Sequence, residues 1–97
     1  MPGVIKMSYE DMENMAKVFE DSSQKINQTI GAMNNVVNLL HEGALQGPPG
    51  TALENAISQT LNQKLKQLAD KMTELQQDIR EAESDLRSAD ESGAKGL

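Results

Sequence analysis

The sequence predicts an all-α protein, an antiparallel two-helix hairpin that dimerises into a four-helix bundle. Apolar residues recur at three- and four-residue steps through both halves of the 97-residue chain, as they do on one face of an amphipathic helix. A single strong break, Gly47-Pro48-Pro49-Gly50, divides the two halves near the middle. Two long helices joined by a short turn are expected to pack side by side in opposite directions.

The first helix is expected over residues 9–41. Ser8, followed three residues later by Asp11, resembles a capping box at its start. The apolar stripe is interrupted only around Ser22-Ser23. The packing residues predicted from this stripe are Phe19, Ile26, Ile30, Met33, Val37 and Leu40.

The second helix is expected over residues 52–90, after a turn at about 42–51. Thr51 and Glu54 form a Ser/Thr-x-x-Glu capping box at its start. From Leu65 onward the apolar steps alternate between three and four, which is typical of a coiled coil. The packing residues predicted here are Ile57, Leu61, Leu68, Met72 and Leu75.

The hairpin as a whole is expected to span residues 1–91, and the small, Gly-rich residues 92–97 are expected to form a flexible tail. Two helices have no interior, because each covers only one side of the other's apolar stripe. The rest of the stripe needs further helices. The simplest source is a second copy of the chain, and the next is a homologous helical hairpin.

Composition argues against several classes of protein. A net charge of -6 disfavours binding to nucleic acid or to an anionic membrane surface, since both require clustered Lys and Arg. Apolar runs such as Val36-Val37 are far too short to span a membrane. The N-terminal residues lack the apolar stretch of a secretory signal. The absence of Cys excludes disulfides and thiolate metal sites.

No motif predicts catalysis, a cofactor or a metal site. The sequence holds no nucleophile turn, no Gly-rich phosphate loop and no pair of acids in an expected cleft, so an enzyme is not expected. His41, the only histidine, is expected to be a solvated residue at a helix end. Carboxylates alternate with Lys and Arg along the second helix, which indicates an ion-paired outer face.

The turn carries a resemblance to a known family. Leu45 lies two residues before Gly47, and Leu53 follows six residues after that glycine. With two long amphipathic helices in about a hundred residues, this arrangement resembles the WXG family of type VII secretion substrates. In that family the turn reads Trp-x-Gly, and its Trp is implicated in docking to the secretion machinery. Leu45 occupies that place, and its side chain buries less area than Trp and has no indole N–H donor.

The resemblance also implies a C-terminal export signal, which reads Tyr-x-x-x-Asp/Glu in the family. Leu86-x-x-x-Asp90 keeps this spacing with an aliphatic residue in the aromatic place. Ile79-x-x-x-Glu83-x-x-Leu86 matches the first elements of a related extended pattern. Tyr9-x-x-x-Glu13 also fits the letters, but it lies at the opposite end of the chain and is interpreted as coincidental.

The function that this resemblance implies is that of a small type VII secretion substrate or co-secreted adaptor acting through helix–helix interaction. Such a protein is cytoplasmic before export and is secreted without a cleavable signal peptide. The implied partners are a second copy or a homologous hairpin, the type VII secretion ATPase, and a larger helical effector. Two alternatives remain: a structural subunit of a helical secretion filament, and a cytoplasmic chaperone of a larger LXG-type toxin.

Overall fold

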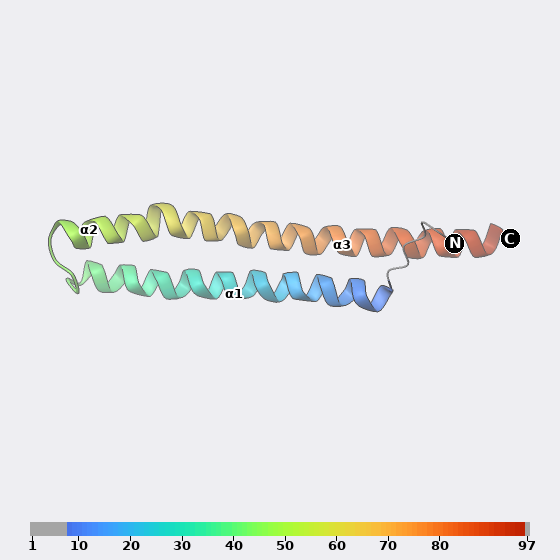
Figure 1. Cartoon of the computed structure of the whole chain (residues 1–97), viewed down its shortest axis with the longest axis horizontal. Helices are drawn as coiled ribbons and strands as arrows, with labels where there is room; N and C mark the ends of the chain where they lie inside the picture. Colours follow the sequence, from blue (N-terminus) through green and yellow to red (C-terminus); the bar gives the residue numbers. More distant parts are fainter. Residues whose placement is uncertain (1–7, 97) are drawn as a thin grey trace.

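A computed structural model of the chain describes residues 8–96, with side chains described for residues 8–90. The elements in chain order are α1 (Tyr9–His41), α2 (Pro48–Asn55), the π-helical turn η1 (Ala56–Leu61) and α3 (Asn62–Gly96). The last three form one continuous helical rod that lies beside α1 and runs in the opposite direction (Figure 1). The molecule measures 74 × 20 × 16 Å. The predicted all-α hairpin is confirmed.

Helix α1 begins with a side-chain cap. Ser8 has an extended backbone, and its Oγ accepts a hydrogen bond from the backbone N–H of Asp11 at 3.0 Å. This bond satisfies one of the amides that a helix leaves free in its first turn. At the other end, Gly43 has a φ of 97°. Its N–H donates to the carbonyl of Leu40 at 3.1 Å, which closes the last turn.

The second rod begins at Pro48, four residues before the start predicted at residue 52. Gly47 precedes it with a φ of 83°, a conformation that favours glycine. The predicted capping box was wrong, because Thr51 lies inside the helix and its N–H donates to the carbonyl of Gly47 at 3.2 Å. The physical reason is that proline suits the first helical positions, where its fixed φ fits and no N–H partner is required.

The second rod also ends later than the sequence indicated. Helix α3 extends to Gly96, although a flexible tail was expected over residues 92–97. No proline interrupts this stretch, and Ala94 and Lys95 are good helix formers that add little cost to that of Gly93. Leu97 lies outside the described residues. The helical hydrogen bonds thus continue past the last apolar position of the stripe.

The core between the helices is thin. Among residues 8–90, the buried apolar side chains are Met12, Ala16, Ile57 and Ala69. Two of these are alanines, and Ser23 is buried beside them. Small side chains allow two helices to approach closely, but they bury little apolar area. The single hairpin therefore has limited hydrophobic stabilisation of its own.

The chain packs closely against itself in the turn. Gly50 is buried, and a Cβ built on it would lie 1.7 Å from the carbonyl oxygen of Leu45. Only glycine leaves room for that oxygen. The first turn of α2 therefore lies directly against the loop that joins the two rods.

We predict that Gly50→Ala strongly destabilises the hairpin, because its Cβ cannot coexist with the Leu45 oxygen without a backbone shift. Gly31→Ala is the matched control. It lies in the middle of α1 with nothing within 4 Å of the added Cβ, so it should stabilise by about 1 kcal/mol. Thermal unfolding followed by circular dichroism measures both. An equal melting temperature for the two variants would contradict this account of the turn.

Candidate interaction surface

The two helices meet along residues spaced seven apart. On α1 one line comprises the buried or half-buried Met12, Phe19, Ile26, Met33 and Leu40, and the next comprises Ala16, Ser23, Ile30 and Val37. On α3 the facing lines are Leu65, Met72 and Ile79, and Ala69, Gln76 and Glu83. Seven-residue spacing keeps side chains on one face of a helix. We call these four lines together the hairpin seam.

Polar side chains fix the alignment of the two helices at the seam. The Ser23 hydroxyl donates to the carbonyl of Ala69 at 3.2 Å, and its oxygen lies 3.0 Å from the hydroxyl oxygen of Thr73. Nearer the turn, Asn62 donates its amide N–H to the Asn34 side-chain oxygen at 2.9 Å. A buried hydroxyl is favourable only where its partners are placed correctly. These contacts therefore disfavour a sliding or rotation of α3 along α1.

Sequence reasoning missed Ser23, which it treated as a gap in the apolar stripe. The signal that identifies this position is its spacing, since Ala16, Ser23 and Ile30 are seven residues apart. A small polar residue at such a position faces the partner helix as an apolar one would. Its buried hydroxyl is satisfied here because the carbonyl of Ala69, a residue that is 2% exposed, accepts its hydrogen bond.

Several leucines of the second rod lie beside the seam. Leu61 and Leu68, expected from the sequence to pack in the hairpin or in its dimer, are 41% and 44% exposed in the single chain. Leu53 is 43% exposed, and Leu75 is half-buried. With Met15 of α1, which is also exposed, these residues form what we call the apolar flank.

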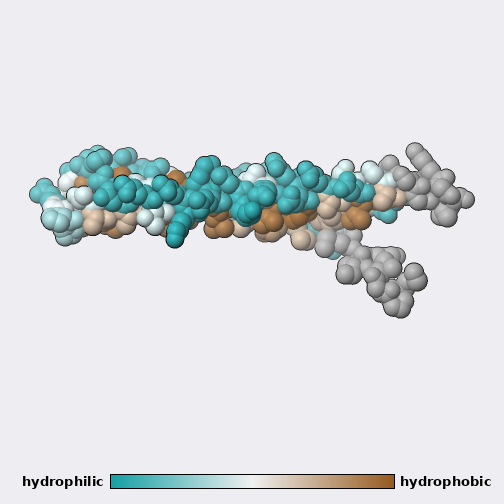
Figure 2. Space-filling view, turned by 90° about the horizontal axis from the view of Figure 1, so that it is seen from above, coloured by the Kyte–Doolittle hydropathy of each residue, from teal (hydrophilic) through white to brown (hydrophobic). Residues whose placement is uncertain are grey.

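The two helices contribute to the apolar flank from the same side of the hairpin. Arg80 lies on the opposite flank of α3 from Leu75, and it contacts Glu13 and Glu20 of α1 at 2.8 and 3.8 Å. Those two acids lie across the seam from Met15 on the α1 helix. The polar flanks of both helices thus face one way and the apolar flanks the other. Figure 2 shows apolar residues gathered along one long edge of the rod.

A shallow groove opens on the outer side of α1 near its start. It is lined by Met15, Val18 and Phe19, together with Asp11 and Asn14. Met15 and Val18 are both exposed. The groove therefore extends the exposed apolar surface at the open end of the hairpin.

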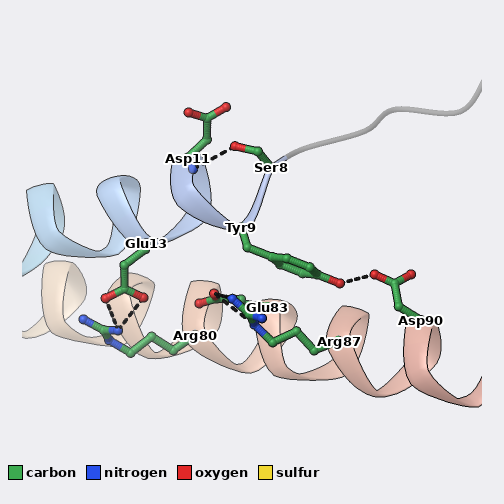
Figure 3. A network of polar contacts seen from close by, with 8 residues as sticks. All are labelled: Ser8, Tyr9, Asp11, Glu13, Arg80, Glu83, Arg87 and Asp90. Carbon is green, nitrogen blue, oxygen red and sulfur yellow. Dashed lines mark hydrogen bonds and ion pairs between the residues drawn. The ribbon is translucent and has the colours of Figure 1, made fainter.

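The open end of the hairpin holds a cluster of polar contacts between the first turns of α1 and the end of α3 (Figure 3). The Tyr9 hydroxyl donates to the Asp90 carboxylate, and the Arg87 guanidinium lies 4.0 Å from the centre of the Tyr9 ring. Arg87 also pairs with Glu83 at 3.1 Å. A cation stacked on an aromatic ring is attracted to the negative face of that ring. We call Tyr9, Glu83, Arg87 and Asp90 the end cluster.

The end cluster and the neighbouring ion pair perturb three pKa values. The Asp90 hydrogen bond raises the pKa of Tyr9, with desolvation as the second cause. The Arg80 guanidinium, through its hydrogen bond, lowers the pKa of Glu13. The same bond raises the pKa of Arg80. Both shifts on the Glu13–Arg80 pair favour the charged forms, so the pair stays ionised at neutral pH.

The four residues expected to form an export signal have different environments. Ile79 is half-buried in the hairpin seam, and Leu86 is 45% exposed. Glu83 and Asp90 both belong to the end cluster. The sequence missed Tyr9 as a neighbour of these residues. No periodicity reveals it, because the contact joins positions that are 81 residues apart in the chain.

The three residues of the turn motif lie around the start of α2. Gly47 is the residue before the helix, and Leu45 and Leu53 are both exposed. His41 is exposed at the end of α1, and its Nε2 lies 3.1 Å from a carboxylate oxygen of Glu54. The turn therefore presents two leucines to solvent.

Neither a metal site nor a membrane span is found in the part of the chain that the structure describes. Among the side chains described for residues 8–90, no three from His, Cys, Asp or Glu converge as metal ligands would. None of the helices over residues 8–96 combines the length and apolarity that crossing a bilayer requires. The features that remain are the apolar flank, the end cluster and the turn.

The family model described as "Proteins of 100 residues with WXG", or WXG100, matches residues 4–91. The chain belongs to the WXG100 family. Comparison with curated proteins and with solved structures returned no match. Membership makes this chain a small helical protein associated with type VII secretion. Members of the family commonly dimerise with helical partners, which agrees with the exposed apolar flank of this WXG100 protein.

We predict that the Glu13–Arg80 ion pair makes the hairpin sensitive to acid. Because the folded-state pKa of Glu13 is lowered, its stabilising contribution is present above the unfolded-state pKa. That contribution is lost as the pH falls through the lowered folded-state value. Melting temperatures measured between about pH 7 and about pH 3 should therefore fall less steeply for Glu13→Gln than for the unmodified chain.

The matched control is Glu81→Gln, an exposed carboxylate for which the structure shows no ion pair among the described side chains. This variant should keep the full acid sensitivity. If Glu13→Gln and the unmodified protein lost stability in parallel over this pH range, the ion pair would have no part in holding the open end together.

Proposed function

We propose that this WXG100 protein is a small type VII secretion substrate or co-secreted adaptor that acts by packing its apolar flank against further helices. The observation that carries the proposal is the flank itself. It places four leucines and Met15 on one side of a rod whose seam buries mainly small residues. Monomeric soluble proteins rarely expose continuous apolar strips of this kind, so the flank is suited to a partner.

The preferred partner is a second copy of the chain. Two hairpins related by a twofold axis place the same flank on both sides of the interface, and the result is a closed four-helix bundle. A homologous hairpin with a similar flank fits by the same geometry. In either assembly, Leu61 and Leu68, which are exposed in the single chain, become part of the buried core.

We infer that the export signal lies at the open end of the hairpin and involves Ile79, Glu83, Leu86 and Asp90. The type VII secretion ATPase is the proposed reader, and the chain is proposed to leave the cytoplasm without a cleavable signal peptide. Leu86 offers an exposed apolar side chain one helical turn before Asp90. The Tyr9 hydroxyl bound to Asp90 supports a signal that depends on the folded hairpin.

The turn is the proposed second contact with the secretion machinery. Leu45, Gly47 and Leu53 occupy the places of the family's aromatic turn motif. Exposed leucines at this end support a docking role, although leucine offers no indole N–H to a partner. A larger helical effector that carries a similar hairpin is a further proposed partner.

We predict that the purified chain has a dimer mass by light scattering, and that Leu68→Asp weakens self-association about tenfold or more, because burying a leucine is worth about 1.5–3 kcal/mol. Gln77→Asp introduces the same charge at an exposed position of α3 that is not part of the flank, and it should leave the dimer unchanged. Circular dichroism checks that both variants stay helical. Growth into fibres would instead favour the filament alternative.

We predict that Asp90→Asn lowers the amount of chain in the culture medium severalfold while its amount in the cells stays at least as high. Asp85→Asn, an exposed acid five residues earlier, is the matched control and should leave export unchanged. Immunoblots of cells and medium, with and without an active type VII ATPase, measure the effect. Retention of the unmodified chain in cells, whether or not that ATPase is active, would favour the cytoplasmic chaperone alternative.

A further inference from the structure

The π-helical turn η1 interrupts the second rod where the sequence alone indicated a continuous α-helix. At its end the backbone N–H of Asn62 donates to the carbonyl of Ile57, five residues back instead of four. A π-turn accommodates one more residue than the α-helical turn it replaces, and such turns, which are rare, are frequently found at functional sites. The extra residue lies within Ala56–Leu61, between the two halves of the second rod.

The spacing of the seam and of the apolar flank changes by one residue across η1. Ile57 and Leu65 are eight residues apart, whereas Leu65 and Met72 are seven apart. Leu53 and Leu61 are likewise eight residues apart, and Leu61, Leu68 and Leu75 follow at intervals of seven. In a continuous α-helix, one extra residue rotates everything beyond it by about 100°. The π-turn absorbs that residue, so each line continues on the same face.

We propose that η1 is a register insert that joins the two halves of the second rod into one binding face. It brings Leu53 into line with Leu61, Leu68 and Leu75, and the apolar flank thereby continues from the turn into α3. The partner for this face is a second copy of the chain, because the flank directly borders the seam lines Leu65 and Met72 and so extends an existing helix–helix interface. The statement about the partner rests on the function proposed above.

Contacts on both sides of η1 prevent the rod from rotating as a whole to relieve the mismatch. Before η1, Gly50 lies in close contact with the Leu45 carbonyl, and Glu54 pairs with His41. Beyond η1, Ser23 binds the Ala69 carbonyl and meets the Thr73 hydroxyl. The first half is thus held by the loop and by His41 of α1, and the second half by Ser23 of α1, so the extra residue is accommodated between them.

A side chain compensates for part of the irregular backbone. The Ser58 hydroxyl donates to the carbonyl of Glu54 at 2.7 Å, immediately beside the start of η1. Such hydrogen bonds from serine to the carbonyl four residues back are common where a helix departs from regular geometry. Ser58, Gln59 and Thr60 are exposed, so a change in their number leaves the seam composition intact.

The register of α3 can be measured with a disulfide, because the natural chain contains no cysteine. The Ser23 and Thr73 oxygens are 3.0 Å apart, so Ser23→Cys combined with Thr73→Cys should form an intramolecular disulfide on oxidation. Gln24→Cys combined with Thr73→Cys is the control and should not, since Gln24 is an exposed neighbour of Ser23. Because this disulfide joins two residues of one chain, its formation measures the register without a second protein.

Two variants at one position test the register insert in the Ser23→Cys/Thr73→Cys background. Deletion of Gln59 removes the extra residue, so η1 becomes α-helical, both halves keep their faces, and the disulfide should still form at the original yield. Insertion of one alanine after Gln59 adds a second extra residue, so the disulfide yield should fall severalfold and the melting temperature should drop. Equal effects of the deletion and the insertion would overturn the proposal, as would loss of the disulfide on deletion.

Light scattering of the same variants, without the cysteines, separates this inference from the proposed function. The deletion variant should dimerise as the natural chain does, and the insertion variant should dimerise severalfold more weakly. An insertion variant that loses the disulfide but dimerises normally would overturn the role of η1 in the binding face. A natural chain that stays monomeric, with the disulfide results as expected, would overturn the proposed self-association and leave the register insert standing.

Discussion

A pair of helices can shield only one side of each other's apolar stripe, and the other features of this hairpin depend on that constraint. The seam uses the small side chains of Ala16, Ser23 and Ala69, which bring the helices close but bury little area. The larger leucines of the second rod are left beside the seam. The molecule therefore pairs two helices through a thin seam and leaves an apolar flank exposed on one side.

Polar contacts give this thin interface a single alignment. Apolar lines spaced seven residues apart tolerate a shift by one heptad, whereas hydrogen bonds between particular side chains do not. Ser23 with Thr73 fixes the middle, Asn34 with Asn62 fixes the region nearer the turn, and Tyr9 with Asp90 fixes the open end. The Gly50 contact in the turn completes the set. Stability and register thus come from different residues.

Membership of the WXG100 family connects this architecture with type VII secretion. The family's aromatic turn residue is a leucine here, and the C-terminal segment has no tyrosine. The fold places Tyr9, from the first turn of α1, against Asp90 near the end of α3. An aromatic ring and a carboxylate therefore lie together at the open end, even though they come from opposite ends of the sequence.

The sequence by itself determined the hairpin, because helical periodicity, the Ser8 cap and the Gly-Pro break are local signals. Two predicted helix boundaries differ from the structure. The helix begins at the prolines, which suit a helix start, and not at the Thr51–Glu54 box, and α3 continues to Gly96. Only the tertiary structure decided which side of each stripe is covered, that Ser23 is buried, and that Tyr9 meets Asp90. These depend on the rotation of one helix against another. The eight-residue steps across the π-turn can likewise be interpreted only once both halves of the second rod are seen to lie beside α1.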